Sequence, residues 1–196
     1  MSQFNKKIYN YSIGSLRAFP LTMPLGCFLF GLIFQNKLAL YFAINFFGAD
    51  LISHGLKLSF KQLYKLLNTD ILPILGSYKR PKGAKYCSCF ISEDNLKGIS
   101  TSPGLPSGHS LLAGFTTIFF ILFLLDKYSI TSFKQLLVVP NYKIIISLFT
   151  VIMIGVSICY SRIYLKCHTI NQVIVGSLIG GLLGYGSYKL YNKYIK

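Results

Sequence analysis

Acidic residues are scarce in this sequence: its 196 residues include only 5 Asp and Glu, against 20 Lys and Arg. Charged residues reach 13% and hydrophobic residues 53%, a balance that is atypical of a soluble domain of this size. No Gly-x-y period, sustained heptad or repeated unit of about 20 to 50 residues is present, which excludes collagen, coiled coils and repeat arrays. The 16 Phe and 14 Tyr exclude intrinsic disorder. The sequence therefore predicts one membrane domain over residues 1–196.

The few possible metal ligands are dispersed. The five acids are scattered along the chain: Asp50, Asp70, Glu93, Asp94 and Asp126. This spacing argues against a site that holds two catalytic metal ions. The cysteines are 5, an odd count that implies no disulfide framework, and Cys87 and Cys89 lack a second pair with the spacing of a zinc site. We predict neither a metal nor a cofactor.

Several apolar stretches are long enough to cross a bilayer, which requires about 20 residues per helix. They cover residues 16–34, 38–56, 109–125, 143–160 and 168–188. We therefore predict an all-α integral membrane bundle of about five transmembrane helices, within a range of about four to six. The sequence assigns no organelle and no oligomeric state.

Two features of these stretches predict how the helices pack. The second stretch contains Asp50, and an ionisable group in lipid costs on the order of 3 kcal/mol, so we expect its carboxylate to face the bundle interior or an aqueous cavity. The fifth contains Gly176, Gly180 and Gly184 at a spacing of four residues. Small residues at that spacing allow two helices to approach closely.

Most of the polar chemistry falls between residues 57 and 108. Lys57, Lys61 and Lys65 recur on one face of an apparent amphipathic helix, and the segment then becomes rich in Pro, Gly, Ser and Lys. Long connections between helices are often functional. With five spans, this connection lies on the same side of the membrane as residues 161–166.

Three clusters in these connections carry the residues of a phosphate site: Lys79-Arg80-Pro81, Pro106-Ser107-Gly108-His109, and Ser161-Arg162 with His168. Ser107 is a candidate N-cap, and the amide of Gly108 at a helix start would attract an anion. Arg80 and Arg162 are two of the 3 Arg in the sequence, and Arg grips phosphate oxygens in bidentate fashion.

The third cluster requires a turn of the chain. Arg162 and His168 would lie about 240° apart on an unbroken helix, at about 100° per residue. They converge only if the chain turns between them, and Lys166 interrupts the apolar pattern there. Gln172 follows His168 by four residues, so a helix beginning there brings its amide to the imidazole.

These motifs resemble those of the type 2 phosphatidic acid phosphatase and haloperoxidase superfamily, which run Lys-x6-Arg-Pro, Pro-Ser-Gly-His and Ser-Arg-x5-His-x3-Asp. The resemblance covers roughly residues 51–184. It implies that His168 is a nucleophile that forms a phosphohistidine and that His109 protonates the leaving oxygen. Arg80, Arg162, Ser107 and the Gly108 amide would bind the phosphate.

The sequence departs from the family pattern at two positions. The first-motif Lys would fall at Pro73, so the cation must come from elsewhere; Lys57 is our first choice, followed by Lys61 and Lys79. Gln172 occupies the place of the usual Asp, as in the dolichyl diphosphatase and glucose-6-phosphatase branches. A neutral amide can accept the imidazole N–H but supplies no charge.

The function that the sequence predicts is a metal-independent membrane phosphatase acting on a lipid phosphate or polyprenyl diphosphate. Its partners would be this substrate and the surrounding membrane lipids. Two alternatives remain open: a sugar-phosphate phosphatase, and a non-catalytic protein that binds anionic phospholipid head groups with its +15 charge. A nucleic-acid partner is not expected, because apolar spans dominate and no recognised binding motif is present.

Overall fold

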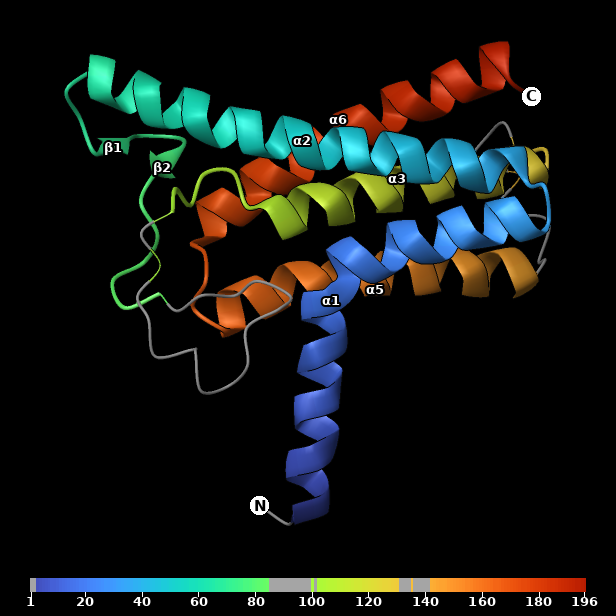
Figure 1. Cartoon of the computed structure of the whole chain (residues 1–196), viewed down its shortest axis with the longest axis horizontal. Helices are drawn as coiled ribbons and strands as arrows, with labels where there is room; N and C mark the ends of the chain where they lie inside the picture. The colour runs from blue at the N-terminus through green and yellow to red at the C-terminus, as the bar shows by residue number, and fades with distance from the viewer. Residues whose placement is uncertain (1–2, 85–99, 101, 131–134, 136–141) are drawn as a thin grey trace.

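The computed structural model describes residues 3–84, 100, 102–130, 135 and 142–196, with residues 3–10 as backbone only. The chain forms long helices packed into a bundle (Figure 1). They are α1 (Gln3–Ile33), α2 (Lys37–Leu66), α3 (Gly108–Lys127), α5 (Tyr142–Tyr164) and α6 (Ile170–Tyr194). A short hairpin, β1 (Ile71–Leu72) and β2 (Gly76–Ser77), follows α2. The predicted all-α membrane bundle is confirmed.

Four helical segments are long and apolar enough to cross a membrane: Tyr11–Ile33, Gly108–Lys127, Tyr142–Tyr164 and Ile170–Tyr194. The helix α2 is not in this set, although it packs against α1 and α3 within the bundle. Its Asn45, Asp50 and His54 interrupt the apolar sequence. We predicted five spans, and α2 is the one whose polar residues set it apart from the other four.

Two features of the α2 region differ from the prediction. Residues 57–66 continue α2 without a break, because no Pro or Gly interrupts them, so Lys57, Lys61 and Lys65 extend the same helix. The hairpin was not predicted at all. It pairs Ile71 with Ser77 in antiparallel register, and its strands are too short to show an alternating pattern in the sequence.

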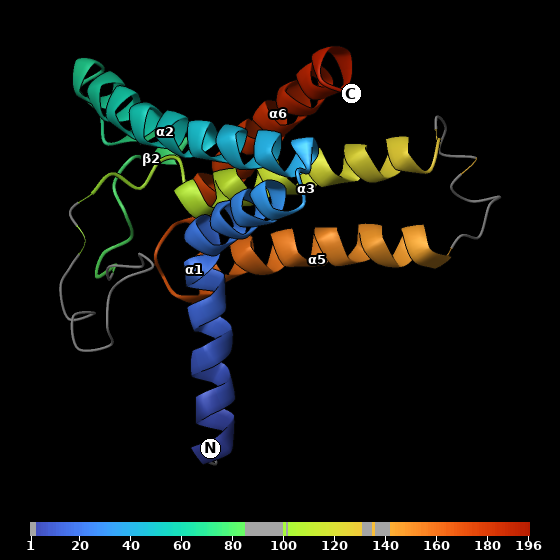
Figure 2. The same ribbon diagram turned by 45° about the vertical axis from the view of Figure 1, so that its right-hand side comes forward.

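The helix α1 is bent. Its N-terminal half stands away from the bundle, while its C-terminal half lies along the other helices (Figures 1 and 2). Pro20 and Pro24 lie inside this helix. A proline lacks the N–H that bonds the preceding turn and its ring crowds that turn, so helices bend at such positions.

The helix α3 lies at the centre and contacts α1, α2, α5 and α6. Its closest neighbour is α6, which approaches through Gly176, Gly180 and Gly184. A Cβ built at Gly176 would lie 2.6 Å from the Ser107 carbonyl oxygen. At Gly180 and Gly184 it would overlap the carbonyls of Leu111 and Phe115. The predicted packing role of this glycine series is confirmed.

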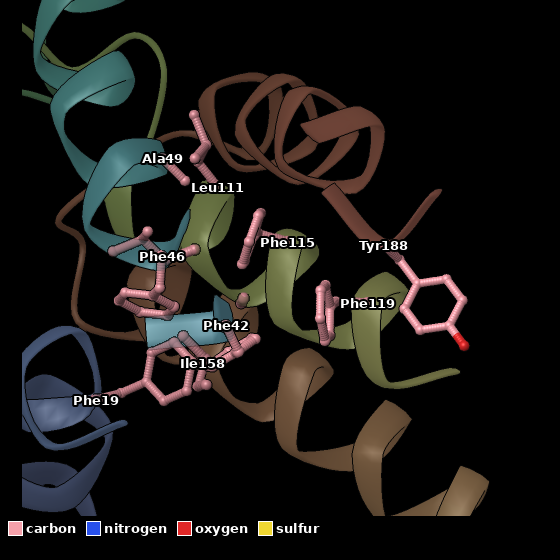
Figure 3. Close-up of a cluster of buried hydrophobic side chains, with 11 residues drawn as sticks. Phe19, Phe42, Phe46, Ala49, Leu111, Phe115, Phe119, Ile158 and Tyr188 are labelled. Atoms are coloured by element: carbon pink, nitrogen blue, oxygen red, sulfur yellow. The ribbon is translucent and has the colours of Figure 1, made fainter. Parts of the chain in front are cut away.

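An aromatic core joins α2 to α3 in the middle of the bundle (Figure 3). Phe42 and Phe46 of α2 are fully buried, as are Phe115 and Phe119 of α3. The rings of Phe42 and Phe119 meet edge to face with centroids 5.1 Å apart. This core fixes α2 beside α3, so the polar residues farther along α2 reach the start of α3.

The cysteines differ from one another. Cys27 and Cys159 are free thiols in apolar surroundings, but Cys167 is disulfide-bonded, and the odd cysteine count gave no indication of this bridge. An odd count excludes a complete framework and not a single bridge. The pair Cys87 and Cys89, which we considered for zinc, lies outside the described residues, as do Glu93 and Asp94.

Gly180→Ala tests the glycine contact between α3 and α6. The added methyl group would overlap the Leu111 carbonyl, and such overpacking costs about 1–3 kcal/mol. We expect a lower melting temperature in detergent. Gly186→Ala is the matched control on the same helix, because nothing lies within 4 Å of its added Cβ. Equal melting temperatures for the two variants would contradict this packing.

Candidate active site

The three polar clusters meet at one end of the bundle, where α3 and α6 begin, α5 ends and the hairpin lies (Figure 1). A cavity of about 490 Å³ opens there. Its polar lining consists of Asp50, His54, Lys57, Arg80, Ser102, His109, Arg162 and His168. Positive side chains dominate this lining, which is the composition of an anion site.

His168 is held in one orientation by two acceptors. Its Nδ1 lies 2.9 Å from the Gly104 carbonyl oxygen and 3.1 Å from Oε1 of Gln172. Both oxygens can only accept, so Nδ1 carries the proton and Nε2 carries the lone pair. The Nη1 group of Arg80 lies 3.3 Å from Nε2 and donates toward it. The nitrogen able to attack an electrophile is therefore Nε2.

Hydrogen bonds hold both ends of the Gln172 amide, since its NH2 group donates and its oxygen accepts. Its Nε2 donates to the carbonyls of Ser77, at 2.9 Å, and Lys79, at 2.7 Å. This contact with two carbonyl oxygens directs Oε1 toward His168 and the Thr169 amide. Thr169 and Gln172 also form the capping box of α6. One side chain thus joins the start of α6, the hairpin and the imidazole.

Arg80 crosses from the loop after the hairpin to the turn before α6. Its Nη1 donates to the Cys167 carbonyl at 3.1 Å, and its Nε donates to the Ser102 hydroxyl and carbonyl. These bonds hold the guanidinium beside Nε2 of His168. A phosphate oxygen at this place would compete with that nitrogen for the Arg80 N–H.

The turn that the sequence predicted between Arg162 and His168 is present. Lys166 adopts a left-handed conformation with φ of 54°, and the amides of Cys167 and His168 both donate to the Arg162 carbonyl. Arg162 lies in the last turn of α5 and is fully buried, with its Nε donating to the Ser161 hydroxyl. The turn brings the Arg162 guanidinium and the His168 imidazole to one cavity.

The start of α3 presents backbone amides to the site. Ser107 is the N-cap residue, as predicted, but its side chain forms no cap; its buried hydroxyl instead lies 3.0 Å from that of Ser110. Its amide donates to the Gln172 carbonyl at 3.0 Å. Gly108 lines the cavity, and first-turn amides such as its own attract anions.

His109 lines the cavity from the first turn of α3. Its Nε2 lies 3.1 Å from the backbone carbonyl oxygen of Arg17 in α1. The imidazoles of His109, in the first turn of α3, and His168, in the turn before α6, therefore face one cavity, which His54 of α2 also lines.

The three lysines considered for the missing first-motif cation occupy different places. Lys57 lines the cavity, with Nζ 3.4 Å from where a Cβ of Gly108 would lie. Lys61 lines a neighbouring hollow instead. Lys79 points away and pairs with Asp70 at 2.7 Å on the exposed surface. Pro73, where the family pattern expects the Lys, is in the loop between the two strands.

Several cavity residues were missed in the sequence. Ser102 and Gly104 hold Arg80 and His168, but only the fold reveals these contacts, since neither belongs to a motif. Gly104 must be glycine, because a Cβ would lie 2.7 Å from the Gln172 amide. Asp50 lines the cavity, so its predicted location is confirmed. It lies 3.9 Å from His54, which shares this lining.

The electrostatics of the cavity favour a neutral His168. Burial is the largest influence, and with the positive charges of Arg80 and Lys57 it holds the pKa of the imidazole well below 6.5. The hydrogen bonds to Gln172 and Gly104 act in the opposite direction. Burial also lowers the pKa of the Arg80 guanidinium, and Arg80 nevertheless stays charged.

Comparison with known proteins identifies the family of this chain. The curated dolichyldiphosphatase of Saccharomyces cerevisiae is 26% identical over 106 residues, which cover 54% of this chain and 39% of that protein. The matched region thus spans well under half of the relative's length. No solved structure matches the chain. The PAP2 superfamily matches residues 38–196, from the second residue of α2 to the C-terminus, and the resemblance drawn from the motifs is confirmed: this chain belongs to the PAP2 superfamily.

Proposed function

We propose that this chain is a membrane phosphatase that hydrolyses a lipid phosphate or lipid diphosphate through a phosphohistidine on His168. One observation carries the proposal. Two acceptors hold Nδ1–H of His168, so the lone pair of Nε2 is available beside Arg80 in a cavity lined by further cations. A neutral imidazole with a directed lone pair is a nucleophile suited to phosphoryl transfer.

In the first step, Nε2 of His168 attacks phosphorus and the bond from phosphorus to the leaving oxygen breaks. His109 gives a proton to that oxygen. The negative charge on the phosphoryl oxygens is met by Arg80, Arg162 and Lys57 and by the amides at the start of α3. Positioning and charge stabilisation of this kind are most of what phosphoryl transfer requires.

In the second step, water attacks the phosphohistidine and gives a proton back to His109. The bond between Nε2 and phosphorus breaks, and inorganic phosphate leaves with His168 neutral again. These two steps use two histidines and three cations of the chain, and the reaction as proposed assigns no step to a metal ion.

A lipid substrate is supported by the surroundings of the cavity. It opens between helices of a membrane bundle, and Pro20, Leu58 and Leu112 add apolar surface to its lining. The name of the yeast relative, dolichyldiphosphatase, favours a diphosphate on a long isoprenoid chain. A sugar phosphate lacks a chain to occupy the apolar part of this lining.

Gln172 is compatible with activity. Its NH2 group faces two carbonyl oxygens, which a carboxylate could not contact without repulsion. The amide still accepts Nδ1–H of His168 and so keeps the nucleophile oriented. What it omits is the negative charge that would stabilise an imidazolium, and the low pKa of His168 means that the imidazole starts neutral.

His168→Ala tests the nucleophile. Purified protein in detergent is incubated with phosphatidate, a polyprenyl diphosphate and a sugar phosphate in the presence of EDTA, and phosphate release is measured. We expect release from a lipid substrate by the unaltered protein and none by the variant, because the attacking nitrogen is lost. Asn192→Ala is the control, because Asn192 is exposed on α6 and is not among the residues that line the cavity. Release that survives His168→Ala would refute the mechanism, and binding of lipid without release by the unaltered protein would favour the non-catalytic alternative.

The pH profile tests the protonation state of His168. Because its pKa lies below 6.5, the neutral form persists as the pH falls through 6.5 and is lost only at lower pH. The acid limb of kcat/KM, which reports groups of the free enzyme, should therefore lie below pH 6.5. An acid limb for His168 at or above this value would contradict the assignment.

Gln172→Glu tests the amide. A carboxylate would lose both bonds to Ser77 and Lys79, and each buried group left unsatisfied costs about 1–3 kcal/mol. We expect a lower melting temperature and a lower kcat at neutral pH. Asn192→Asp is the matched control, an exposed amide near the end of the same helix. A faster Gln172→Glu enzyme of unchanged stability would show instead that the site lacks a negative charge.

A further inference from the structure

The helix α1 reaches the active site although it precedes the family match, which begins at residue 38. Pro20 lines the cavity together with His109 and His168. The Arg17 carbonyl oxygen lies 3.1 Å from Nε2 of His109. No sequence motif pointed to α1, so this contact is a property of the assembled bundle.

The contact determines which nitrogen of His109 carries a proton. A backbone carbonyl can only accept, so Nε2 must be the donor, and it keeps its proton while the bond lasts. Proton exchange with a substrate is then left to Nδ1. The bond also restricts rotation of the ring, which would otherwise change the nitrogen facing the cavity.

The bend of α1 affects the turn that carries the Arg17 carbonyl. Pro20 has no N–H to bond the Leu16 carbonyl four residues earlier, and its ring crowds the turn that contains Leu16 and Arg17. Arg17 follows Leu16 in this turn of the bent helix α1 (Figures 1 and 2). A carbonyl oxygen has two lone pairs, so one that is tilted outward can accept a bond from a neighbouring helix.

We propose that α1 is a positioning element for the general acid, in which the Pro20 bend holds the Arg17 carbonyl on Nε2 of His109. This inference rests on the proposed function. When substrate is bound, His109 carries a proton on both ring nitrogens. Nδ1 gives its proton to the leaving oxygen as the bond to phosphorus breaks, which leaves His109 neutral, and Nδ1 later takes a proton back from the attacking water. Nε2 remains bonded to Arg17 throughout.

Pro20→Ala tests this role through the leaving group. Alanine restores an N–H that can bond the Leu16 carbonyl. We expect α1 to straighten as a result, which withdraws the Arg17 carbonyl from Nε2 of His109. The leaving group of an alkyl phosphate such as phosphatidate is an alkoxide, which needs a proton. The leaving group of p-nitrophenyl phosphate is a stable phenolate anion, which needs none. General acid catalysis contributes about 100-fold or more, so misplacing His109 should lower kcat for the alkyl substrate by at least about 10-fold. The loss for the aryl substrate should be under about 3-fold.

Two further variants keep the result interpretable. Pro24→Ala alters the other proline of α1, which is not among the residues lining the cavity, and should leave the ratio of alkyl to aryl rates unchanged. In a His109→Ala background, Pro20→Ala should have no further effect on that ratio. Melting temperatures of all variants report whether the bundle is intact.

Equal losses on both substrates, or additive losses in the double variant, would overturn the positioning role and leave the phosphatase assignment standing. An unaltered protein that releases phosphate from neither substrate would overturn both. The readout is a ratio of rates on one enzyme, so a general loss of folded protein cannot produce the expected pattern.

Discussion

The close approach of α3 and α6 sets the geometry of the whole site. Because Gly176, Gly180 and Gly184 carry no side chains, the backbone of α6 packs directly on the carbonyls of α3. The start of α6 then lies beside the start of α3, where the Ser107 amide reaches the Gln172 carbonyl. His109 and His168 come from these two helix starts. Their relative position therefore depends on backbone contact, which is stiffer than contact between side chains.

The second constraint is the hydrogen-bond network around Gln172. It connects three segments that are far apart in sequence: the hairpin carbonyls, the capping box of α6 and the ring of His168. Buried networks of this kind impose a single arrangement, because each unsatisfied group would be costly. The network also explains how a family member tolerates an amide at a position where a carboxylate is usual. The hairpin loop supplies acceptors, and an amide is the group that can donate to them.

Much of this could be predicted from the sequence, for identifiable reasons. The helices follow from apolar length, the turn at Lys166 from a break in the apolar pattern, and the location of Asp50 from the cost of charge in lipid. The contacts of Gly104 and Ser102 could not be predicted, because they depend on which loop passes which helix. The role of the Arg17 carbonyl was also hidden, since a backbone atom has no sequence signature. The hairpin was too short for its period to be visible.

Because α2 continues without a break past Lys57, the site can tolerate changes in the length of the chain between Lys57 and Arg80. In the family pattern the first cation and the Arg share one short segment, so their separation in space depends on the length of that segment. Here Lys57 is carried by a helix that the aromatic core holds in place, and Arg80 lies beyond a hairpin. Insertions in residues 67–79 would lengthen the connection without moving Nζ of Lys57 from the Gly108 backbone. A cation on a packed helix is also already ordered when an anion binds, so less conformational entropy is lost at that moment.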